Sequence, residues 1–356
     1  MSIHRAPGDA ILSPMRIDLR SDTVTKPTPA MRRAMSEAEV GDDERDGDPT
    51  TRRLEERVAS MLGKDAALFF PSGVMANQAA IRVLTAPATE VLVDATAHIV
   101  EGEIAGLAAL NGVQIRPVRP SGRVMHAGDL ARAIRQPSRY DPALSAVCIE
   151  NTHNSAGGVV TAPEELRAIA DVAHGRGLPV HLDGARLWNA AVALGTSPAE
   201  LAAHVDTVMV AFSKGLGAPI GAAVAAPASL IDALWTARKL FGGAMRQSGV
   251  VAAAALYGIE HHYDRLAEDH RHARILAERL DGVAGASVVP PDTNIVMIDL
   301  PSGMDAEQVV AAAGLEGVHV TAWTPTRIRL VTHLDLSAAD TDIAATVIAR
   351  VLTAAR

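Results

Sequence analysis

The sequence predicts an α/β fold with a mainly parallel sheet covered by helices, a smaller C-terminal α+β domain and an N-terminal arm. Short apolar runs recur along the chain, and segments with helical periodicity separate them. Apolar strands linked through helices are typical of parallel sheets buried on both faces. After about residue 260 the pattern changes to a long helix, three short strands and a terminal helix, which indicates the smaller domain.

Two helices follow an extended arm, and proline marks the start of each. Thr28-Pro29 and Asp48-Pro49 both combine an N-cap residue with proline at the first helical position. The second helix has one apolar face and ends at Gly63. We therefore predict an arm with its first helix, a large domain and a small domain at residues 1–50, 51–258 and 259–356.

Apolar runs place the strands of both domains. The large domain has predicted strands at residues 66–70, 90–94, 145–151, 178–183 and 206–212, with a helix at 162–177. The small domain has predicted strands at residues 294–300, 317–323 and 327–333. Residues 218–235 carry two prolines and an aspartate, so this stretch is interpreted as a strand and a helix start rather than a membrane span.

Composition excludes several functional classes. The formal net charge is −8 over 356 residues, and no run of lysine and arginine is present, which argues against nucleic-acid or anionic-membrane partners. The first fifteen residues lack an apolar stretch of signal-peptide length, so a cytoplasmic location is predicted. The single cysteine, Cys148, excludes an internal disulfide.

Polar residues cluster where the predicted strands end, which is where open α/β sheets bind ligands. Only four of the 33 basic residues are lysines, and Lys214 lies in the glycine-rich loop after a strand. A primary amine can condense with an aldehyde, whereas a guanidinium cannot. Ser72-Gly73 before a helix could bind a phosphate or only cap the helix. Asp183 could face a protonated ring nitrogen or only cap a turn.

These residues together match the requirements of pyridoxal 5′-phosphate, which needs an imine-forming lysine, a phosphate site and an acid near its ring nitrogen. At this point the sequence resembles the threonine aldolase family, which has the aspartate-aminotransferase-like fold. The resemblance starts at Ile17 and runs through "IDLRSDTVTKPT", "VGDD", "PSG", "ENTHN", "HLDGAR", "SKGLGAP", "GGAMRQSG" and "IRLVTH". It implies a seven-stranded sheet of the pyridoxal-phosphate transferase type, and cleavage of L-threonine, L-allo-threonine or a related β-hydroxy-α-amino acid to glycine and an aldehyde.

The resemblance also implies site roles. Lys214 would attach to the cofactor aldehyde, Asp183 would pair with the ring nitrogen, and His98 would stack on the ring and act as the base. The implied cofactor-binding residues are Ser72, Gly73, Val74, His98, Asp183, Arg186, Ser213, Lys214 and, from a neighbouring subunit, Arg246. The substrate carboxylate would be bound by Ser21, Arg186 and Arg329, because a planar guanidinium matches a carboxylate. Shared active sites imply a homo-oligomer, with a dimer of dimers expected.

The sequence departs from the family pattern around the predicted substrate pocket. The departures are Glu101 and Gly102 in place of an aromatic pair, Arg45 for a tyrosine, Tyr140 for a histidine near the substrate hydroxyl, and Val74 for a threonine near the phosphate. Glu103 supplies the acidic residue that the family pattern has after the histidine. Glu103 and Tyr140 are therefore candidate pocket residues. A β-eliminating lyase acting on another amino acid therefore stays an alternative.

Three further sequence patterns bear on function. "GLGAPIG" at residues 215–221 has the wrong spacing for a dinucleotide loop. The histidines of residues 260–280 lack metal-ligand spacing, so no metal site is predicted and these histidines are expected on a solvated helix surface. A non-catalytic homologue that binds the cofactor would have lost Lys214, Asp183 or the carboxylate arginines, and all are present.

Overall fold

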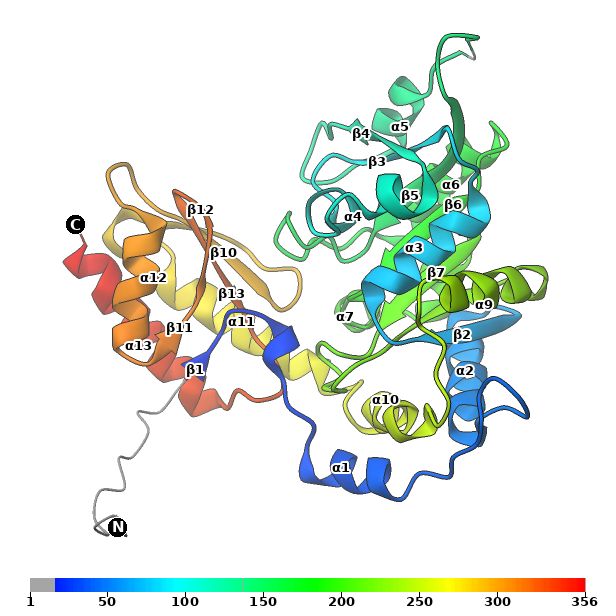
Figure 1. Ribbon diagram of the computed structural model, residues 1–356. Coiled ribbons are helices and arrows are strands. Elements are labelled where there is room, and N and C mark those ends of the chain that lie inside the picture. The colour runs from blue at the N-terminus through cyan, green and yellow to red at the C-terminus, as the bar shows by residue number, and fades with distance from the viewer. Residues whose placement is uncertain (1–16, 137, 356) are drawn as a thin grey trace, which may run out of the picture.

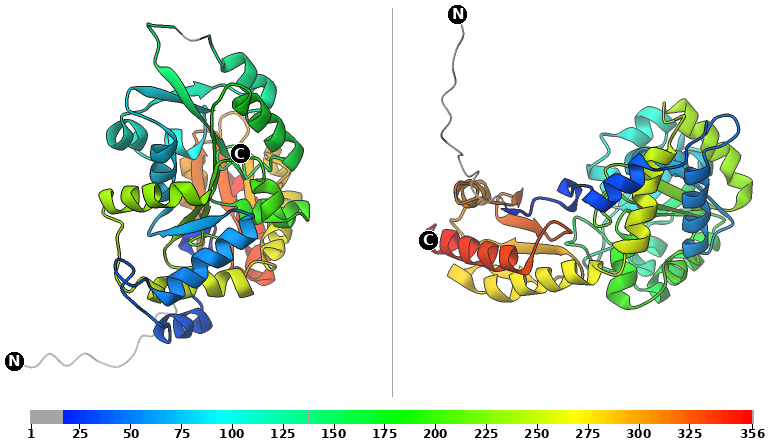
Figure 2. Two further views of the ribbon diagram at one scale, coloured as in Figure 1. Left: turned by 90° about the vertical axis from the view of Figure 1, so that its right-hand side faces the viewer. Right: turned by 90° about the horizontal axis from the view of Figure 1, so that it is seen from below.

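A computed structural model describes residues 17–136 and 138–355 of the chain. It has a large α/β domain with a seven-stranded sheet and a smaller domain with a four-stranded sheet (Figure 1). The right-hand view of Figure 2 shows the two domains side by side, with the N-terminal arm running between them. The predicted fold class is confirmed. The prediction for the first fifteen residues lies outside the described residues.

The large sheet has strand order β2-β8-β7-β6-β5-β3-β4. Only β8 runs antiparallel to its neighbours, so the other six strands end at the same edge. Their bounds are β2 Ala66–Phe70, β3 Thr89–Asp94, β4 Gln114–Val118, β5 Ala143–Glu150, β6 Val180–Gly184, β7 Thr207–Ala211 and β8 Ala222–Ala226. The edge strand β4 was not predicted, because its sequence, "QIRPV", contains a proline and is not a continuous apolar run.

Helices cover both faces of this sheet. Alternate residues of β2 point to opposite faces: Leu68 packs with the cluster under α3 and α9, and Phe69 with the cluster under α2 and α10. The helices are α1 Pro29–Ser36, α2 Pro49–Leu62, α3 Gly73–Leu84, α4 His98–Glu101, α5 Ala127–Ala133, α6 Pro163–His174, α7 Leu187–Leu194, α8 Pro198–Ala202, α9 Ile231–Leu240 and α10 Gly249–His261, with a short π-helix, η2, at Leu107–Asn111.

Helix ends follow the sequence signals. The Thr28 and Asp48 side chains accept hydrogen bonds from the third backbone amide of α1 and of α2, which satisfies amides that have no partner inside a helix. Gly63 has φ of 62° and ends α2 in the left-handed conformation, which glycine adopts without the steric cost that a side chain brings. Both predicted helix starts and the predicted stop are confirmed.

The small domain contains an antiparallel sheet of order β12-β13-β10-β9. Its strands are β9 Ser287–Val289, β10 Ile295–Asp299, β12 Thr321–Thr324 and β13 Arg327–Val331, and its helices are α11 Leu266–Leu280, α12 Ala306–Leu315 and α13 Ala338–Ala354. The predicted strand at 317–323 is split, because β11 (Val318–His319) pairs instead with β1 (Ile17–Asp18) of the arm. The boundaries between predicted domains stay a prediction, but Ile17 and Leu19 belong to the small-domain hydrophobic cluster.

The histidines of α11 contradict one expectation. His270 and His272 are each 3% exposed, and His262, just before this helix, is 6% exposed, so these residues do not lie on a solvated surface. His270 contacts Asn189 on α7 at 3.2 Å, because α11 packs against the large domain. The prediction was wrong because the many charged residues of this segment suggested an exposed helix, although the helix also has a buried face. Among the described residues, no helix is both long and apolar enough to cross a bilayer.

Candidate active site

A cavity of about 320 Å³ opens at the carboxyl edge of the large sheet, between the two domains and the arm. Its lining includes five of the predicted site residues: Ser21, His98, Arg186, Lys214 and Arg329. The large sheet, the arm and β13 of the small domain all contribute. Residues far apart in the sequence therefore converge at the edge where the parallel strands end.

Lys214 follows β7 in the loop that the sequence marked with glycines. Its backbone oxygen accepts a hydrogen bond of 3.2 Å from the hydroxyl of Thr25 in the arm. Burial and the nearby Arg186 guanidinium lower the pKa of Lys214 to about 8, although Asp22 and Asp183 oppose this change. An amine with this pKa is partly uncharged near neutral pH, which is the form that attacks a carbonyl.

Asp183 is the penultimate residue of β6, and its carboxylate is held by two donors. Its Oδ1 accepts from the amide of Ala185 at 3.0 Å, and its Oδ2 accepts from Nδ2 of Asn77 on α3 at 2.8 Å. The residue is 2% exposed. These bonds fix the orientation of a buried acceptor at the carboxyl end of β6, a feature that a site for a protonated ring nitrogen needs.

Asn77 is itself oriented by a buried histidine. Its Oδ1 lies 3.0 Å from Nε2 of His181, and Nδ1 of His181 lies 2.9 Å from the hydroxyl of Thr207. Burial lowers the pKa of His181 to about 4, so the ring is neutral at physiological pH. Because Oδ1 can only accept, we place the His181 proton on Nε2, and Nδ1 accepts from Thr207.

His98 opens α4 and contacts Glu103. Its Nδ1 lies 3.1 Å from Oε1 of Glu103, which also accepts from Nδ2 of Asn77 at 2.8 Å. The hydrogen bond to Glu103 raises the pKa of His98 despite its burial. A Cβ on Gly102 would lie 2.7 Å from Nε2 of His98, so glycine at this position leaves space for the imidazole ring.

The predicted phosphate residues lie at the amino end of α3. The Ser72 hydroxyl caps the helix and accepts from the amide of Met75 at 3.2 Å. Gly73 and Asn77 are one helical turn apart on the same face, and Asn77 bonds to Asp183. The positive end of the α3 dipole, which suits an anion, is therefore about one turn from the amide that bonds to Asp183. Val74 is 41% exposed there.

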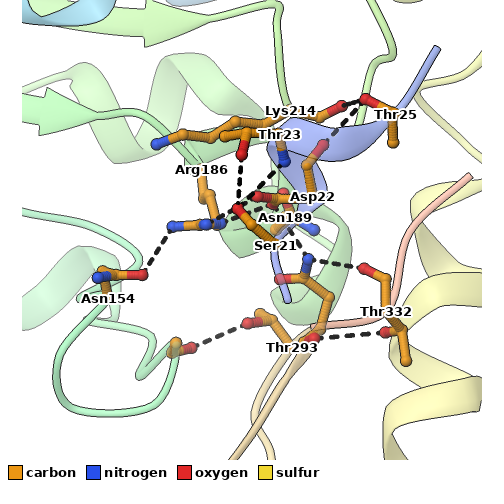
Figure 3. Close-up of polar contacts among 12 residues, drawn as sticks. Ser21, Asp22, Thr23, Thr25, Asn154, Arg186, Asn189, Lys214, Thr293 and Thr332 are labelled. Carbon is orange, nitrogen blue, oxygen red and sulfur yellow. Dashed lines mark hydrogen bonds and ion pairs between the residues drawn. The ribbon is translucent and has the colours of Figure 1, made fainter. Parts of the chain in front are cut away.

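Two arginines, Arg186 and Arg329, line the cavity beside the arm and the small domain; Figure 3 shows the first of them next to Asp22. Arg186 precedes α7 and forms a two-bond ion pair with Asp22 of the arm. Arg329 lies on β13 with its guanidinium 4.4 Å from the Trp323 ring centroid. Its Nε is buried without a hydrogen-bond partner among the described residues. An unpaired buried donor and two guanidinium groups make this end suitable for a carboxylate.

Two predicted residues, Tyr140 and Arg246, have their surroundings elsewhere within the chain. Tyr140 lies in the loop before β5 and is 86% exposed. The carboxyl end of this eight-residue strand reaches the site, so Tyr140 is about 25 Å away along the strand axis. Arg246 forms ion pairs with Asp42 and Glu44 of its own chain. Glu103 is 4% exposed and lies behind His98.

The residues fit pyridoxal 5′-phosphate better than they fit a metal ion. Ligand-type atoms of His98, Glu103 and Asp183 lie within 4.8 Å of one another, a spacing that a cation could use. However, the NH₂ group of Asn77 donates to both carboxylates from between them, and a donor at that point is incompatible with a cation there. The lysine amine, the buried carboxylate and the helix terminus instead meet the needs of the cofactor.

Sequence reasoning missed several residues of this site. Asn77 and Gln78 are adjacent amides in an otherwise apolar stretch of α3, and this contrast could have indicated a buried polar network. Asp22 belongs to the quoted "IDLRSDTVTKPT" motif, but its partner Arg186 is 164 residues away. Asn154 accepts hydrogen bonds from Arg186 and Arg329, and no local sequence pattern predicts these contacts.

Comparison with known proteins agrees with this geometry. A model of the beta-eliminating lyase family matches residues 18–303. Low-specificity L-threonine aldolase 1 of Arabidopsis thaliana is 39% identical over 91% of this chain and 93% of its own length. Low specificity L-threonine aldolase of Escherichia coli O157:H7 is 37% identical over 90% of this chain and 95% of its own length.

The fold is also shared with solved structures. Threonine aldolase from Leishmania major superposes with a TM-score of 0.79, at 20% identity, over 94% of this chain and 99% of that one. The sequence matches and the shared fold lead to one assignment. The chain belongs to the beta-eliminating lyase family, and its relatives include proteins named low-specificity L-threonine aldolases.

Proposed function

We propose that this chain cleaves L-threonine, L-allo-threonine or a related β-hydroxy-α-amino acid to glycine and an aldehyde. Membership of the family makes the chain a lyase that uses pyridoxal 5′-phosphate, so the proposal concerns the bond that breaks and the substrate. The main observation behind it is that Lys214 lines one cavity together with His98. The same cavity is lined by Arg186 and Arg329. The relatives named low-specificity L-threonine aldolases support it.

Bound pyridoxal 5′-phosphate supplies an electron sink for the bond broken at the substrate Cα. Asp183 keeps the electron sink effective, because its carboxylate favours a protonated ring nitrogen. Lys214 provides the amine that holds the cofactor. Ser72, Gly73 and Val74 would hold the phosphate at the start of α3, with Ser213 beside the lysine.

Arg186, Arg329 and Ser21 fix the substrate carboxylate at the other end. Holding this group would decide which bond at the substrate Cα is aligned for cleavage. In the proposed reaction this is the bond to Cβ. His98, acting directly or through water, takes the proton of the β-hydroxyl group, which contributes a rate factor of about 10² to 10⁴ for a positioned base.

The test separates this proposal from β-elimination on the same substrate. Purified enzyme with L-threonine should release equal amounts of acetaldehyde and glycine, and a Lys214→Ala variant should release neither. Release of 2-oxobutyrate and ammonia would instead assign β-elimination. A chain that binds the cofactor but shows no spectral response to glycine or threonine would be a binding homologue without activity.

The active form is proposed to be a homo-oligomer with shared sites, a dimer of dimers, in the cytoplasm. Exposed Arg246 and Tyr140 support an assembly in which each could reach a neighbouring cavity. Co-expressed Lys214→Ala and Arg246→Ala chains test this. If sites are shared, mixed oligomers regain activity that neither variant has alone. Mixed oligomers without activity would contradict sharing.

A further inference from the structure

A turn of the arm places Asp22 next to the catalytic lysine. Ser21 accepts hydrogen bonds from the amide and the hydroxyl of Thr23, which forms a short 3-10 turn over Asp22–Val24. The Thr25 hydroxyl contacts both the Asp22 and the Lys214 backbone oxygens, at 2.9 and 3.2 Å. Asp22 is 0% exposed. Figure 3 shows this carboxylate among groups from both domains.

Asp22 occupies one edge of the Arg186 guanidinium. Its Oδ2 accepts from Nε at 2.7 Å, and its Oδ1 accepts from Nη2 at 2.8 Å. Burial opposes ionisation of Asp22, but the Arg186 charge outweighs it and keeps the pKa of the carboxyl far below its usual value. This fork-to-fork pair is planar and rigid. It leaves Nη1 as the Arg186 nitrogen that faces Asn154 and the cavity.

Nη1 of Arg186 and Nη1 of Arg329 converge on one oxygen. Oδ1 of Asn154 accepts from the first at 3.2 Å and from the second at 3.1 Å. One arginine comes from the large domain and the other from the small domain. Two guanidinium nitrogens that can share one amide oxygen are spaced to share a carboxylate oxygen.

Asp22 is also bonded to the loop that leads into the small-domain sheet. Oδ2 of Asp22 accepts from Nδ2 of Asn294 at 3.2 Å, and the same amide donates to the Thr332 backbone oxygen at 3.0 Å. The backbone amide of Thr332 in turn donates a hydrogen bond of 2.9 Å to the backbone oxygen of Asn294. Thr332 follows β13, the strand that carries Arg329. One carboxylate therefore contacts Arg186 directly and the Arg329 strand through Asn294.

We infer that Asp22 is a positioning residue that aims Arg186 and Arg329, from two domains, at one substrate carboxylate. The inference rests on the proposed function, in which these arginines bind an α-amino acid. Asp22 itself contacts neither the substrate nor the cofactor in this arrangement. The alternative is a structural role, in which Asp22 only neutralises a buried guanidinium.

The test uses two variants of the holoenzyme and one control. Asp22→Asn keeps the shape but removes the charge. Asp22→Glu keeps the charge but displaces the carboxylate by one methylene group. The control, Asp299→Asn, breaks a two-bond pair with Arg327 on the same strand β13, outside the cavity and partly exposed. The measurements are glycine affinity by calorimetry, KM and kcat for L-threonine, and the unfolding temperature.

If Asp22 positions the arginines, both Asp22 variants weaken glycine binding and raise KM about 10- to 100-fold, as loss of a charge-assisted hydrogen bond implies. The rise in KM should exceed the fall in kcat, and Asp299→Asn should leave all three constants unchanged. Charge neutralisation alone would leave the Asp22→Glu enzyme with wild-type affinity. That result, or failure of both Asp22 variants to fold, overturns the inference. Wild-type enzyme that binds glycine but releases no acetaldehyde would contradict only the proposed reaction.

Discussion

The two ends of the active-site cavity are built in different ways. The proposed cofactor end uses α3, β6 and the segment after α4, all from the large domain, and the Asn77 amide donates to both of its buried carboxylates. The carboxylate end joins the arm, the residue before α7 and a strand of the small domain through Asp22, Arg186 and Arg329. The first end is fixed within one domain, whereas the second depends on how two domains and the arm meet.

Because of this difference, residues that act on the reacting bond and residues that bind the substrate carboxylate lie at different ends of the site. Changes at the cofactor end act on residues near the reacting bond, so they should lower kcat. Changes at the carboxylate end alter an interaction that substrate and transition state share, so they should raise KM. The comparison therefore makes a separate kinetic prediction for each end.

The largest effect is expected for Lys214→Arg. Arginine keeps the positive charge but cannot condense with an aldehyde, so kcat should fall about 10⁴-fold or more. Acetaldehyde release from L-threonine measures it. Retention of more than a tenth of the wild-type kcat would show that charge, rather than the amine, is what the cofactor end requires.

Asp183→Asn should lower kcat by about 10² to 10³-fold, the cost of removing one preorganised charge from a reacting site. The KM for L-threonine should change much less. Steady-state kinetics on cofactor-saturated enzyme gives both constants. A variant that raises KM with unchanged kcat would break the distinction between the two ends.

The amine of Lys214 should react about tenfold more slowly for each pH unit below 8, because protonation removes its lone pair and its pKa is about 8. The rate at which cofactor-free protein takes up pyridoxal, which has no titrating phosphate, measures this between pH 6 and 10, and it should level off above pH 8. A rate that still rises tenfold per pH unit above pH 9, as for an ordinary lysine, would contradict the lowered pKa.

Arg329→Lys should raise KM about 10- to 100-fold while kcat changes less, because lysine cannot reproduce the planar donor pair. The kinetics of L-threonine cleavage gives the result. Arg327→Lys, on the same strand but paired with Asp299 outside the cavity, is the matched control. Equal effects of both changes would mean that strand β13, rather than the guanidinium, matters.

The smallest effect is expected for Val74→Thr. A hydroxyl in the first turn of α3 can add one hydrogen bond to the cofactor phosphate, worth about 0.5 to 1.5 kcal/mol. Pyridoxal phosphate should then bind about two- to tenfold more tightly, as equilibrium dialysis can show. Val250→Thr, in the first turn of α10, is the control. Weaker binding by Val74→Thr would place the phosphate elsewhere.

The sequence predicted those features that depend on neighbouring residues. The strand at 66–70, the caps at Thr28 and Asp48 and the stop at Gly63 were all correct, because a cap or an apolar run is determined within a few residues. The motifs also predicted Lys214 and Arg329, which the structure places in one cavity.

Features that depend on distant partners could not be predicted in this way. Asp22 looks like any polar residue of an arm until Arg186 lies beside it. The charges around His270 suggested a solvated helix, because the packing of α11 on α7 is a tertiary contact. Tyr140 lies beyond the far end of β5 from its own cavity, so its predicted place near a substrate depends on a neighbouring subunit and stays a prediction.

Helix α3 carries the proposed phosphate-binding end and, one turn later, the amide that holds Asp183. Its pitch therefore sets the span between two groups of one ligand. Inserting a single residue between Gly73 and Asn77 would rotate the amide by about 100° and move it about 1.5 Å along the axis. Asp183 would lose that donor although no side chain had been exchanged. This stretch should therefore accept changes of residue far more readily than changes of length.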